Sequence, residues 1–354
     1  MAILAKDLAK QIGVSTATLS LVLNGKPGIS DKTRDMVEKK IIELGYSDML
    51  HKSPKSGTPT SVQNTVSPSE TKMISFILFK DNGKLLGMNS FFPLIFDGIE
   101  SQARRYGYGL NVINIEKSLI DEQLHYIPDS GASGFIIFAT EMKENMIDKF
   151  AKIGLPFVVF DNYFNNRDLY CAKVNNEQGT YLAVKHLYEM GHRHIGYLSS
   201  GLDIDSFHER QKWALDAANT FGMTCKKEDV LTIGYPADEA EMGMDQILDR
   251  ASHRLLPTAF LADNDLVSIG AMQSMKKHGY QLPEDYSFVG FDDRPLAALV
   301  EPKLTTIQLP RQRFGAAAVD MLVQQIQYPS DDYINVEING KLIIRNSVAK
   351  KKEL

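Results

Sequence analysis

The stretch Gly13-Val14-Ser15-Thr16-Ala17-Thr18-Leu19-Ser20-Leu21-Val22-Leu23-Asn24 organises the N-terminal part of the chain. Apolar residues between Leu8 and Ile12 keep helical spacing and predict a short amphipathic helix before it. Gly13 accepts the backbone angles of a tight turn, and Ser15 is a favourable N-cap for the helix that follows. The stretch therefore predicts two short helices joined by a turn.

The second predicted helix has an inner side and an open side, and a third helix follows it. The apolar residues predicted to face inward are Leu19, Val22, Leu23, Val37, Ile41 and Leu44. The open side of the second helix carries Thr16, Ala17, Ser20 and Leu21. Ser30 can cap the third helix and Gly45 can end it. This arrangement matches a helix-turn-helix, whose second helix enters the major groove of DNA. A small helical domain without a DNA role would show the same spacing, so the pattern alone leaves both interpretations open.

The run VSTATLSLVLNGKPGISDKTRDMVEKKIIELGY (residues 14–46) resembles the headpiece of lactose-repressor/galactose-repressor (LacI/GalR) transcription regulators. The resemblance implies that Thr16 and Ala17 read bases. It also implies DNA-backbone-contacting or capping roles for Ser15, Thr18, Ser20, Asn24, Ser30 and Thr33. Leu21 stands where most members carry arginine, which can grip guanine at two atoms, whereas leucine can only touch a thymine methyl. We therefore expect an operator that differs from the usual family sequence at that step.

Length and composition set the broad class. The chain has 354 residues, enough for two or three domains with well-buried cores. No apolar run approaches the roughly 18 residues of a membrane span, and the N-terminus lacks the pattern of a signal peptide. Its two cysteines, Cys171 and Cys225, suit a reducing compartment and are expected to stay unpaired. A cytoplasmic protein without a membrane partner is expected.

Charge is unevenly distributed. Residues 1–58 contain nine Lys/Arg and six Asp/Glu, a net of +3, so the remainder of a chain of net −5 carries −8. A mildly basic head on an acidic body favours a small DNA-binding module attached to another domain.

Residues 51–72 differ in composition from both neighbours. Ser, Thr, Pro and Gly occupy thirteen of these 22 positions, so the segment cannot bury enough apolar surface to offset its ordering entropy. Relatives in the family carry a hinge helix just after the positions of Gly45-Tyr46, with a leucine that wedges into the minor groove. Pro54 and Pro59 oppose a helix here, and Leu50 is the only wedge candidate. The predicted division is a headpiece at 1–48, a flexible linker without a hinge helix at 49–72, and a sensor at 73–354.

From Met73 onward, short apolar runs alternate with amphipathic stretches. The predicted strands are Ile74–Phe79, Leu110–Ile115, Phe135–Phe138, Phe157–Phe160, Ile195–Ser199, Ala259–Ala262 and Phe288–Phe291. The predicted helices are Pro93–Tyr106, Glu177–Met190, His208–Phe221, Asp265–His278 and Gln312–Ile326. Such alternation predicts parallel sheets covered on both faces, and the length favours two α/β lobes. The fold class is therefore an all-α headpiece plus a two-lobed α/β sensor, which by resemblance is similar to periplasmic sugar-binding proteins.

Polar side chains follow several of these strands. Ligands of such folds bind beyond the carboxyl ends of the strands, where Asp161, Asn264 and Asp292 stand, while Arg210 begins a helix after another strand. Carboxylates, an amide and a guanidinium suit the hydroxyl groups of a sugar, and an aromatic ring can stack on its apolar face. The alternative for each is a helix cap, which we favour for Asp263 and Asp293.

The family resemblance favours a ligand role for other residues. PFVVFDN, SFHER, FLADND and SFVGFDD resemble the effector-contacting segments of the family's sensor. The ligand contacts expected from strand position, from the resemblance or from both are Phe91, Phe92, Asp161, Arg210, Tyr235, Asn264 and Asp292. Tyr235 is expected by resemblance alone. Trp213 stands where relatives have glycine, and either fills the cleft or packs.

No catalytic or metal-binding motif stands out. His192 and His194 have no third ligand at useful spacing, and no phosphate loop or nucleophile elbow is present. We therefore expect no cofactor, no metal and no enzymatic activity. The sequence predicts a homodimeric repressor that binds double-stranded operator DNA and responds allosterically to a sugar or oligosaccharide. The family resemblance implies that residues 312–326 and the flank of the first lobe form the dimer face. The alternative is a sugar-binding or enzymatic α/β protein whose N-terminal module does not bind DNA.

Overall fold

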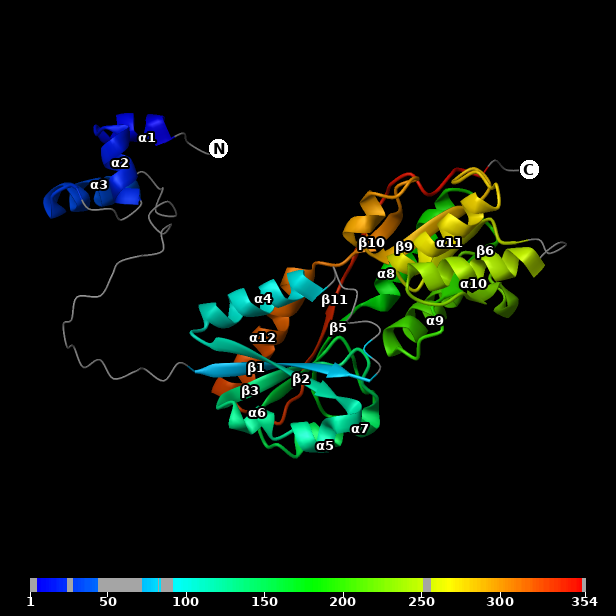
Figure 1. The fold of residues 1–354 in the computed structure, drawn as a ribbon, viewed down its shortest axis with the longest axis horizontal. Coiled ribbons are helices and arrows are strands. Elements are labelled where there is room, and N and C mark those ends of the chain that lie inside the picture. The colour runs from blue at the N-terminus through cyan, green and yellow to red at the C-terminus, as the bar shows by residue number, and fades with distance from the viewer. Residues whose placement is uncertain are drawn as a thin grey trace. The chain divides into compact units, whose positions relative to one another are not determined.

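The computed structural model describes residues 5–23, 28–43, 72–81, 83, 92–250 and 256–351 (Figure 1). The chain divides into a first unit, Met1–Ser67, and a second unit, Pro68–Leu354. Residues 49–71 lie outside the described residues, so the predicted linker and its missing hinge helix stay predictions. Within the described ranges, no helix is long and apolar enough to cross a membrane.

The described part of the first unit consists of α1 (Ala5–Ile12), α2 (Thr16–Leu23) and α3 (Asp31–Glu43). Their side chains share one core, made of Leu8, Ala9, Ile12, Leu19, Val22, Val37 and Ile41. Gly13 has φ +82°, a conformation that glycine adopts without a steric cost, so the predicted glycine turn is confirmed. The side chain of Leu23 and all of Leu44 lie outside the described residues.

Both predicted N-caps are present. The Ser15 Oγ accepts the amide of Thr18 at 3.0 Å, and the Ser30 Oγ accepts the amide of Thr33 at 3.3 Å. At the other end of α1, the Lys40 Nζ donates to the Ile12 carbonyl at 3.0 Å, which places a cation at the negative end of the helix dipole. These contacts fix where α1 ends and where α2 and α3 begin.

The second unit contains two lobes, each built on a sheet that has six strands among the described residues. The first sheet has the order β11-β5-β4-β3-β1-β2, and every neighbouring pair in it is parallel. Its strands are β1 (Met73–Lys80), β2 (Gly109–Glu116), β3 (Ala132–Phe138), β4 (Phe157–Phe160), β5 (Tyr170–Val174) and β11 (Asn335–Ile338). One face is covered by α4 (Phe92–Arg105) and α12 (Arg311–Gln327). The other face is covered by α5 (Ile120–Gln123), α6 (Tyr126–Asp129) and α7 (Glu144–Ala151), as Figure 1 shows.

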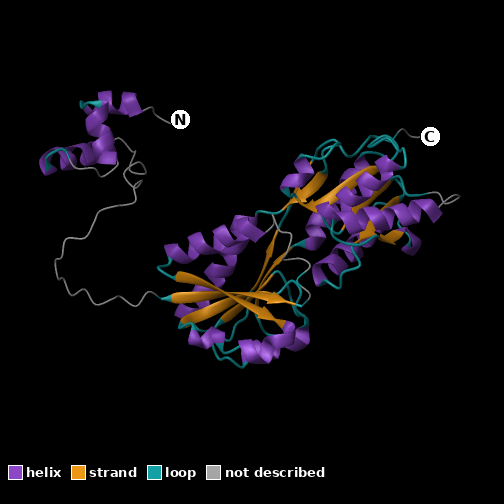
Figure 2. Cartoon of the chain, in the orientation of Figure 1, coloured by secondary structure: helices purple, strands orange, loops and turns teal. Residues whose placement is uncertain are grey.

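The second sheet has the order β12-β10-β9-β8-β6-β7. Its strands are β6 (Ile195–Ser199), β7 (Val230–Thr232), β8 (Ala259–Ala262), β9 (Ser287–Asp292), β10 (Thr305–Gln308) and β12 (Lys341–Ile343). Its helices are α8 (Asn176–Glu189), α9 (Asp205–Thr220), α10 (Ala237–Arg250) and α11 (Asp265–Lys277). Figure 2 shows helices on both sides of the strands in each lobe. In the second lobe the pair α8 and α9 packs on one face of the sheet and the pair α10 and α11 on the other. Among the described strands of this sheet, only β12 runs antiparallel to its neighbour.

The chain passes between the lobes at residues 174–176, 308–311 and 338–341. The predicted two-lobed α/β architecture with parallel sheets is confirmed, and β4, β6 and β8 have the predicted bounds. Because β5, β7, β10, β11 and β12 are short or carry polar residues, they lack the apolar run on which the prediction relied. Cys171 and Cys225 are free thiols, as expected.

Candidate functional site

The N-terminal end of α2 presents small and polar side chains to solvent. Ser15, Thr16, Ala17 and Ser20 are exposed, whereas Thr18 and Leu21 are half-buried. The Ser15 and Thr18 hydroxyls are 2.8 Å apart, so the cap also orders the first turn. Exposed amides and hydroxyls at a helix N-terminus suit contact with phosphate groups.

The second predicted cap repeats this pattern on α3. Ser30 is exposed and Thr33 is half-buried, and their hydroxyls are 2.8 Å apart. Asn24, the remaining predicted DNA contact, lies outside the described residues. The described headpiece residues predicted to contact DNA therefore reach the surface at the starts of α2 and α3.

Leu21, the departure from the family pattern, has a partly buried side chain. Its Cδ1 would lie 3.6 Å from a β-carbon at Gly28, and its carbonyl accepts the Arg34 Nη1 at 3.5 Å. Leu21 is therefore held against the following turn and leaves only part of its side chain free for a groove.

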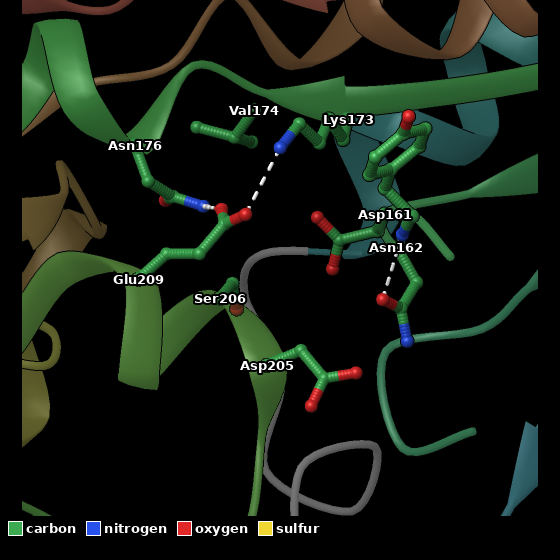
Figure 3. A pocket seen from close by; sticks show the side chains of 9 residues that line it. Asp161, Asn162, Lys173, Val174, Asn176, Asp205, Ser206 and Glu209 are labelled. Carbon is green, nitrogen blue, oxygen red and sulfur yellow. Dashed lines mark hydrogen bonds and ion pairs between the residues drawn. The ribbon is translucent and has the colours of Figure 1, made fainter. Parts of the chain in front are cut away.

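A narrow pocket lies where the two lobes meet (Figure 3). Its volume of about 20 Å³ holds roughly one water molecule. Its walls come from the end of β4, from β5, and from the starts of α8 and α9. The lining residues are Asp161, Asn162, Tyr163, Lys173, Val174, Asn176, Asp205, Ser206 and Glu209. Of the predicted ligand contacts, only Asp161 is among them.

Asp161 directly follows β4 in a strained conformation. Its φ of 62° is uncommon for a residue other than glycine, and such strain often occurs at functional sites. Thr140 donates its hydroxyl to the Asp161 Oδ2 at 2.5 Å. Burial raises the pKa of Asp161 to about 6, although the Thr140 hydrogen bond and the charge of Arg210 act in the opposite direction. Near neutral pH, where Asp161 is ionised, its buried charge therefore lowers the free energy of unfolding.

Glu209 of α9 joins the two lobes. Its carboxylate accepts the Lys173 Nζ at 2.9 Å and the Asn176 Nδ2 at 2.7 Å, as Figure 3 shows. Lys173 also lies 3.4 Å from Glu337 of β11. Burial lowers the pKa of Lys173, but these two carboxylates outweigh that effect and leave it raised. Lys173 therefore stays charged and holds the first lobe to α9.

Lys143, in the first lobe before α7, makes a second ion pair across the lobes. Its Nζ lies 3.0 Å from Asp203 and 3.1 Å from Asp205. Partly exposed pairs of this kind contribute about 0–1 kcal/mol each. Ligand binding can therefore compete with them.

Arg210 lies directly behind the pocket and is buried. Its Nε donates to the Asn176 Oδ1 at 2.9 Å, and its Nη1 donates to the Asp263 carbonyl at 2.6 Å. The guanidinium carbon lies 3.8 Å from the centre of the Phe291 ring. Arg210 thus fixes Asn176, which itself lines the pocket.

Asp292 is buried between two arginines. Its Oδ1 lies 3.5 Å from the Arg210 Nη1, and its Oδ2 accepts both the Nε and the Nη2 of Arg294 at 3.3 Å. Its φ of 103° is a second strained position. Nearby, burial raises the pKa of Asp265 to about 8, and the charge of Asp292 acts in the same direction.

The predicted caps after β8 and β9 are wrong. Asp263 caps no helix, because it accepts the Tyr197 hydroxyl at 2.8 Å and the Ser200 amide and hydroxyl at 2.6 Å. Asn264 is the N-cap of α11 instead, and its Oδ1 accepts the Leu266 and Val267 amides at 3.0 and 3.2 Å.

Asp293 pairs with Arg345 at 2.6 Å and accepts the Gln308 Nε2 at 2.7 Å, so it does not cap the following turn either. The successive carboxylates after β9 thus serve an ion-pair network rather than a helix end.

The two described aromatic candidates, Phe92 and Tyr235, do not line the pocket. Phe92 stacks on Phe76 with ring centres 5.7 Å apart, at the start of α4. Tyr235 is buried in the second-lobe core, where burial raises its pKa against the charge of Arg294. Phe91 lies outside the described residues. A ligand role for these residues stays a prediction.

The pocket contains functional candidates that the sequence did not suggest. Lys173 and Asn176 lie on either side of the β5–α8 connection, and β5 was not predicted as a strand. Glu209 lies within the SFHER segment beside Arg210, so that segment was identified but this residue was not. Recognising β5 would have placed Asn176 beyond a strand end.

The chain matches known proteins in both of its parts. Residues 5–48 match the family described as bacterial regulatory proteins, lacI family, and residues 184–348 match the periplasmic binding protein-like domain. The chain is 30% identical over 353 residues to the HTH-type transcriptional repressor PurR of Vibrio vulnificus (strain CMCP6), with 98% of each chain covered. It is 27% identical over 349 residues to the ribose operon repressor of Haemophilus influenzae, with 98% of this chain and 99% of that one covered.

The fold is also similar to a solved structure. The complex of the transcriptional regulator CelR with cellobiose superposes with a TM-score of 0.70 at 23% identity, covering 98% of this chain and 100% of that one. At this identity the likeness concerns the fold.

Proposed function

The chain belongs to the lacI family of bacterial regulatory proteins, and from that premise we propose how this member regulates transcription. It is a DNA-binding regulator, and a small polyhydroxylated ligand held between its lobes changes the affinity of the headpiece for an operator. The observation that carries this proposal is the pocket at the lobe junction, whose walls are joined by the Lys173–Glu209 ion pair. A ligand that enters there competes with contacts that hold the two lobes together.

On the DNA side, α2 enters the major groove. Thr16 and Ala17, both exposed, meet the base edges, and the free part of Leu21 meets a thymine methyl. The residues that contact the DNA backbone or keep the helix ends in place are Ser15, Thr18, Ser20, Asn24, Ser30 and Thr33. Two headpieces of a homodimer read the halves of a near-palindromic site, and bound protein represses transcription.

On the ligand side, Asp161, Asn176 and Glu209 bind hydroxyl groups. Arg210 and Asp292 stand directly behind them and become reachable when the lobes move. The remaining ligand contacts that we propose for that arrangement are Asn264, Phe91, Phe92 and Tyr235. A pocket of about 20 Å³ is too small for a sugar ring, so the lobe arrangement that binds ligand differs from this one. That difference couples the sites, because a ligand shifts a conformational equilibrium only by its differential affinity for the two states.

The proposed function also specifies the domain bounds, the cellular location and the dimer face. The domains are the headpiece at 1–48, the linker at 49–72 and the sensor at 73–354, and the protein works in the cytoplasm without a cofactor. The relatives named above are repressors, and we propose that this chain likewise catalyses no reaction. The dimer face involves α12 and the adjoining flank of the first lobe.

The DNA-binding proposal is tested by fluorescence anisotropy with DNA from upstream of the chain's own gene and its neighbours. Ala17→Glu places a negative charge on the exposed start of α2, and at least tenfold weaker specific binding is expected. Gln11→Glu makes the same charge change at an exposed position of α1 and serves as the matched control. Wild-type binding should fall steeply with salt. Equal binding by both variants would refute the assignment of α2.

The ligand proposal is tested by thermal shift of the full chain with a panel of sugars and nucleobases. Because Arg210 and Asp292 are buried, conservative variants are appropriate. Arg210→Lys and Asp292→Asn should lose the stabilisation by whichever panel member stabilises wild type. Lys185→Gln, on the surface of α8, is the control and should keep it. Retained stabilisation in both cleft variants would remove these residues from the site.

A further inference from the structure

A second and larger pocket adjoins the narrow one. Its volume is about 440 Å³, within the range of about 300–1,000 Å³ typical of small-molecule sites. It shares Lys173, Asn176 and Glu209 with the narrow pocket, so the two spaces meet at the same three side chains. A ligand in the narrow pocket that extends past Glu209 enters the larger one.

The larger pocket contains Trp213, the only tryptophan in the chain. The side chain is half-buried on α9, and the Lys212 Nζ lies 4.4 Å from its ring centre. An indole ring with polar groups around it offers an apolar surface for the C–H face of a sugar and hydrogen-bonding groups for its hydroxyls. Trp213 can therefore stack against a bound sugar in addition to packing on the protein.

The charges around both pockets disfavour an anion. The narrow pocket carries Asp161, Asp205 and Glu209. The larger one adds Glu177 and Glu337, whereas the basic residues that line the two are Lys173, Lys212 and His208.

The two lysines have different partners. Lys173 is neutralised between Glu209 and Glu337, at 2.9 and 3.4 Å, and Lys212 lies over the Trp213 ring. A phosphate or carboxylate on the ligand would meet five carboxylates, on Asp161, Glu177, Asp205, Glu209 and Glu337, against the two ammonium groups of Lys173 and Lys212, so the site suits an uncharged ligand.

We propose that the effector is an uncharged saccharide of two or more units. One ring lies at Asp161 and Asn176 between the lobes, and the next lies beside Trp213 in the larger pocket, with Glu209 at the link between them. This inference rests on the proposed function and specifies its ligand class. It makes Trp213 the residue that selects disaccharides over single sugars.

The test uses Trp213 fluorescence, excited where tyrosine absorbs little, in the full-length protein. The probes are cellobiose, maltose, lactose, sucrose, trehalose and melibiose, the single sugars glucose, galactose, fructose and ribose, and glucose 6-phosphate. At least one disaccharide should change the emission and raise the unfolding temperature. Its component single sugars should bind at least tenfold more weakly, and glucose 6-phosphate should bind more weakly than glucose.

Variants separate stacking from folding. Calorimetric titration of Trp213→Leu should show about three- to tenfold weaker binding of the responding disaccharide and unchanged binding of its single sugars. Trp213→Phe keeps an aromatic face and should keep most of the preference. Phe221→Leu, at the far end of α9 against Tyr181 and Tyr188, is the control and should match wild type.

Each result that contradicts this inference identifies which part of it is wrong. If a single sugar binds as tightly as any disaccharide, and Trp213→Leu binds like wild type, the second subsite is wrong while the proposed sugar response stands. Tighter binding of glucose 6-phosphate than of every neutral sugar would overturn the charge argument. No response from any sugar would overturn both this inference and the sugar class of the proposed function, whereas binding of operator DNA would still stand.

Discussion

Replacing Asp161 by asparagine should make the sensor more stable at neutral and alkaline pH. The pKa of this carboxyl group is raised from 3.8 to about 6, chiefly by burial. Between these values the folded state holds a proton that the unfolded state has released, so stability falls as pH rises through this window. Asparagine has no charge to desolvate, can accept the Thr140 hydrogen bond, and tolerates the φ of 62° better than most residues.

The size of this gain in stability follows from the pKa shift of Asp161. About two pKa units at roughly 1.4 kcal/mol each give about 3 kcal/mol as an upper bound. Because Asp161 reaches the pocket, solvent screening reduces the expected gain to about 1–2 kcal/mol. For a unit of this size that gain raises the unfolding temperature by about 2–6 °C.

The assay is thermal unfolding of wild type and Asp161→Asn from pH 4 to pH 8, monitored by circular dichroism. The difference between the two proteins should be small at pH 4, grow through pH 6 and level off by pH 8. Asp216→Asn, an exposed change on α9, should stay within about 0.5 kcal/mol of wild type at every pH. A difference that does not vary with pH, or an asparagine variant less stable at pH 8, would show that the buried charge of Asp161 does not lower the stability of the sensor.

Two further substitutions test local packing. Ser15→Ala should cost the headpiece about 1 kcal/mol because the Thr18 amide loses its acceptor. Amide hydrogen exchange of α2 should quicken, whereas Thr16→Ala, at an exposed position of the same helix, should not quicken it. Gly98→Ala should destabilise the sensor by more than about 2 kcal/mol, because its β-carbon would stand 2.1 Å from the Gln312 carbonyl oxygen and force α4 from α12. Denaturant unfolding measures that loss, and an unchanged midpoint would show that the two helices separate at little cost.

A strand can be predicted accurately from the sequence when a run of apolar residues marks it. β4, β6 and β8 are central, continuously apolar strands, and their bounds were predicted residue for residue. β11 and β12 pair at sheet edges with half-exposed residues, so no apolar run marks them. Their positions depend on pairing with distant strands, which sequence periodicity does not report.

The candidate site shows the same limit. A strand-end carboxylate at Asp161 was predictable, because the apolar run before it was clear. The cap after β8 was assigned to Asp263, whereas Asn264 makes it, because neighbouring polar residues after a strand compete for one cap and only geometry decides between them. Lys173 and Glu209 lie far apart in the chain and make contact across the lobes. The sequence around either residue does not indicate that the other is its partner.

The most direct test of the account is the linkage between the two binding sites. Operator affinity is measured by anisotropy at increasing concentrations of the sugar that changes Trp213 fluorescence, and sugar affinity is then measured with and without saturating operator. Each ligand should change the affinity of the other by the same factor, and Arg210→Lys should remove the effect. Saturation of the pocket by sugar with an unchanged operator affinity would contradict it.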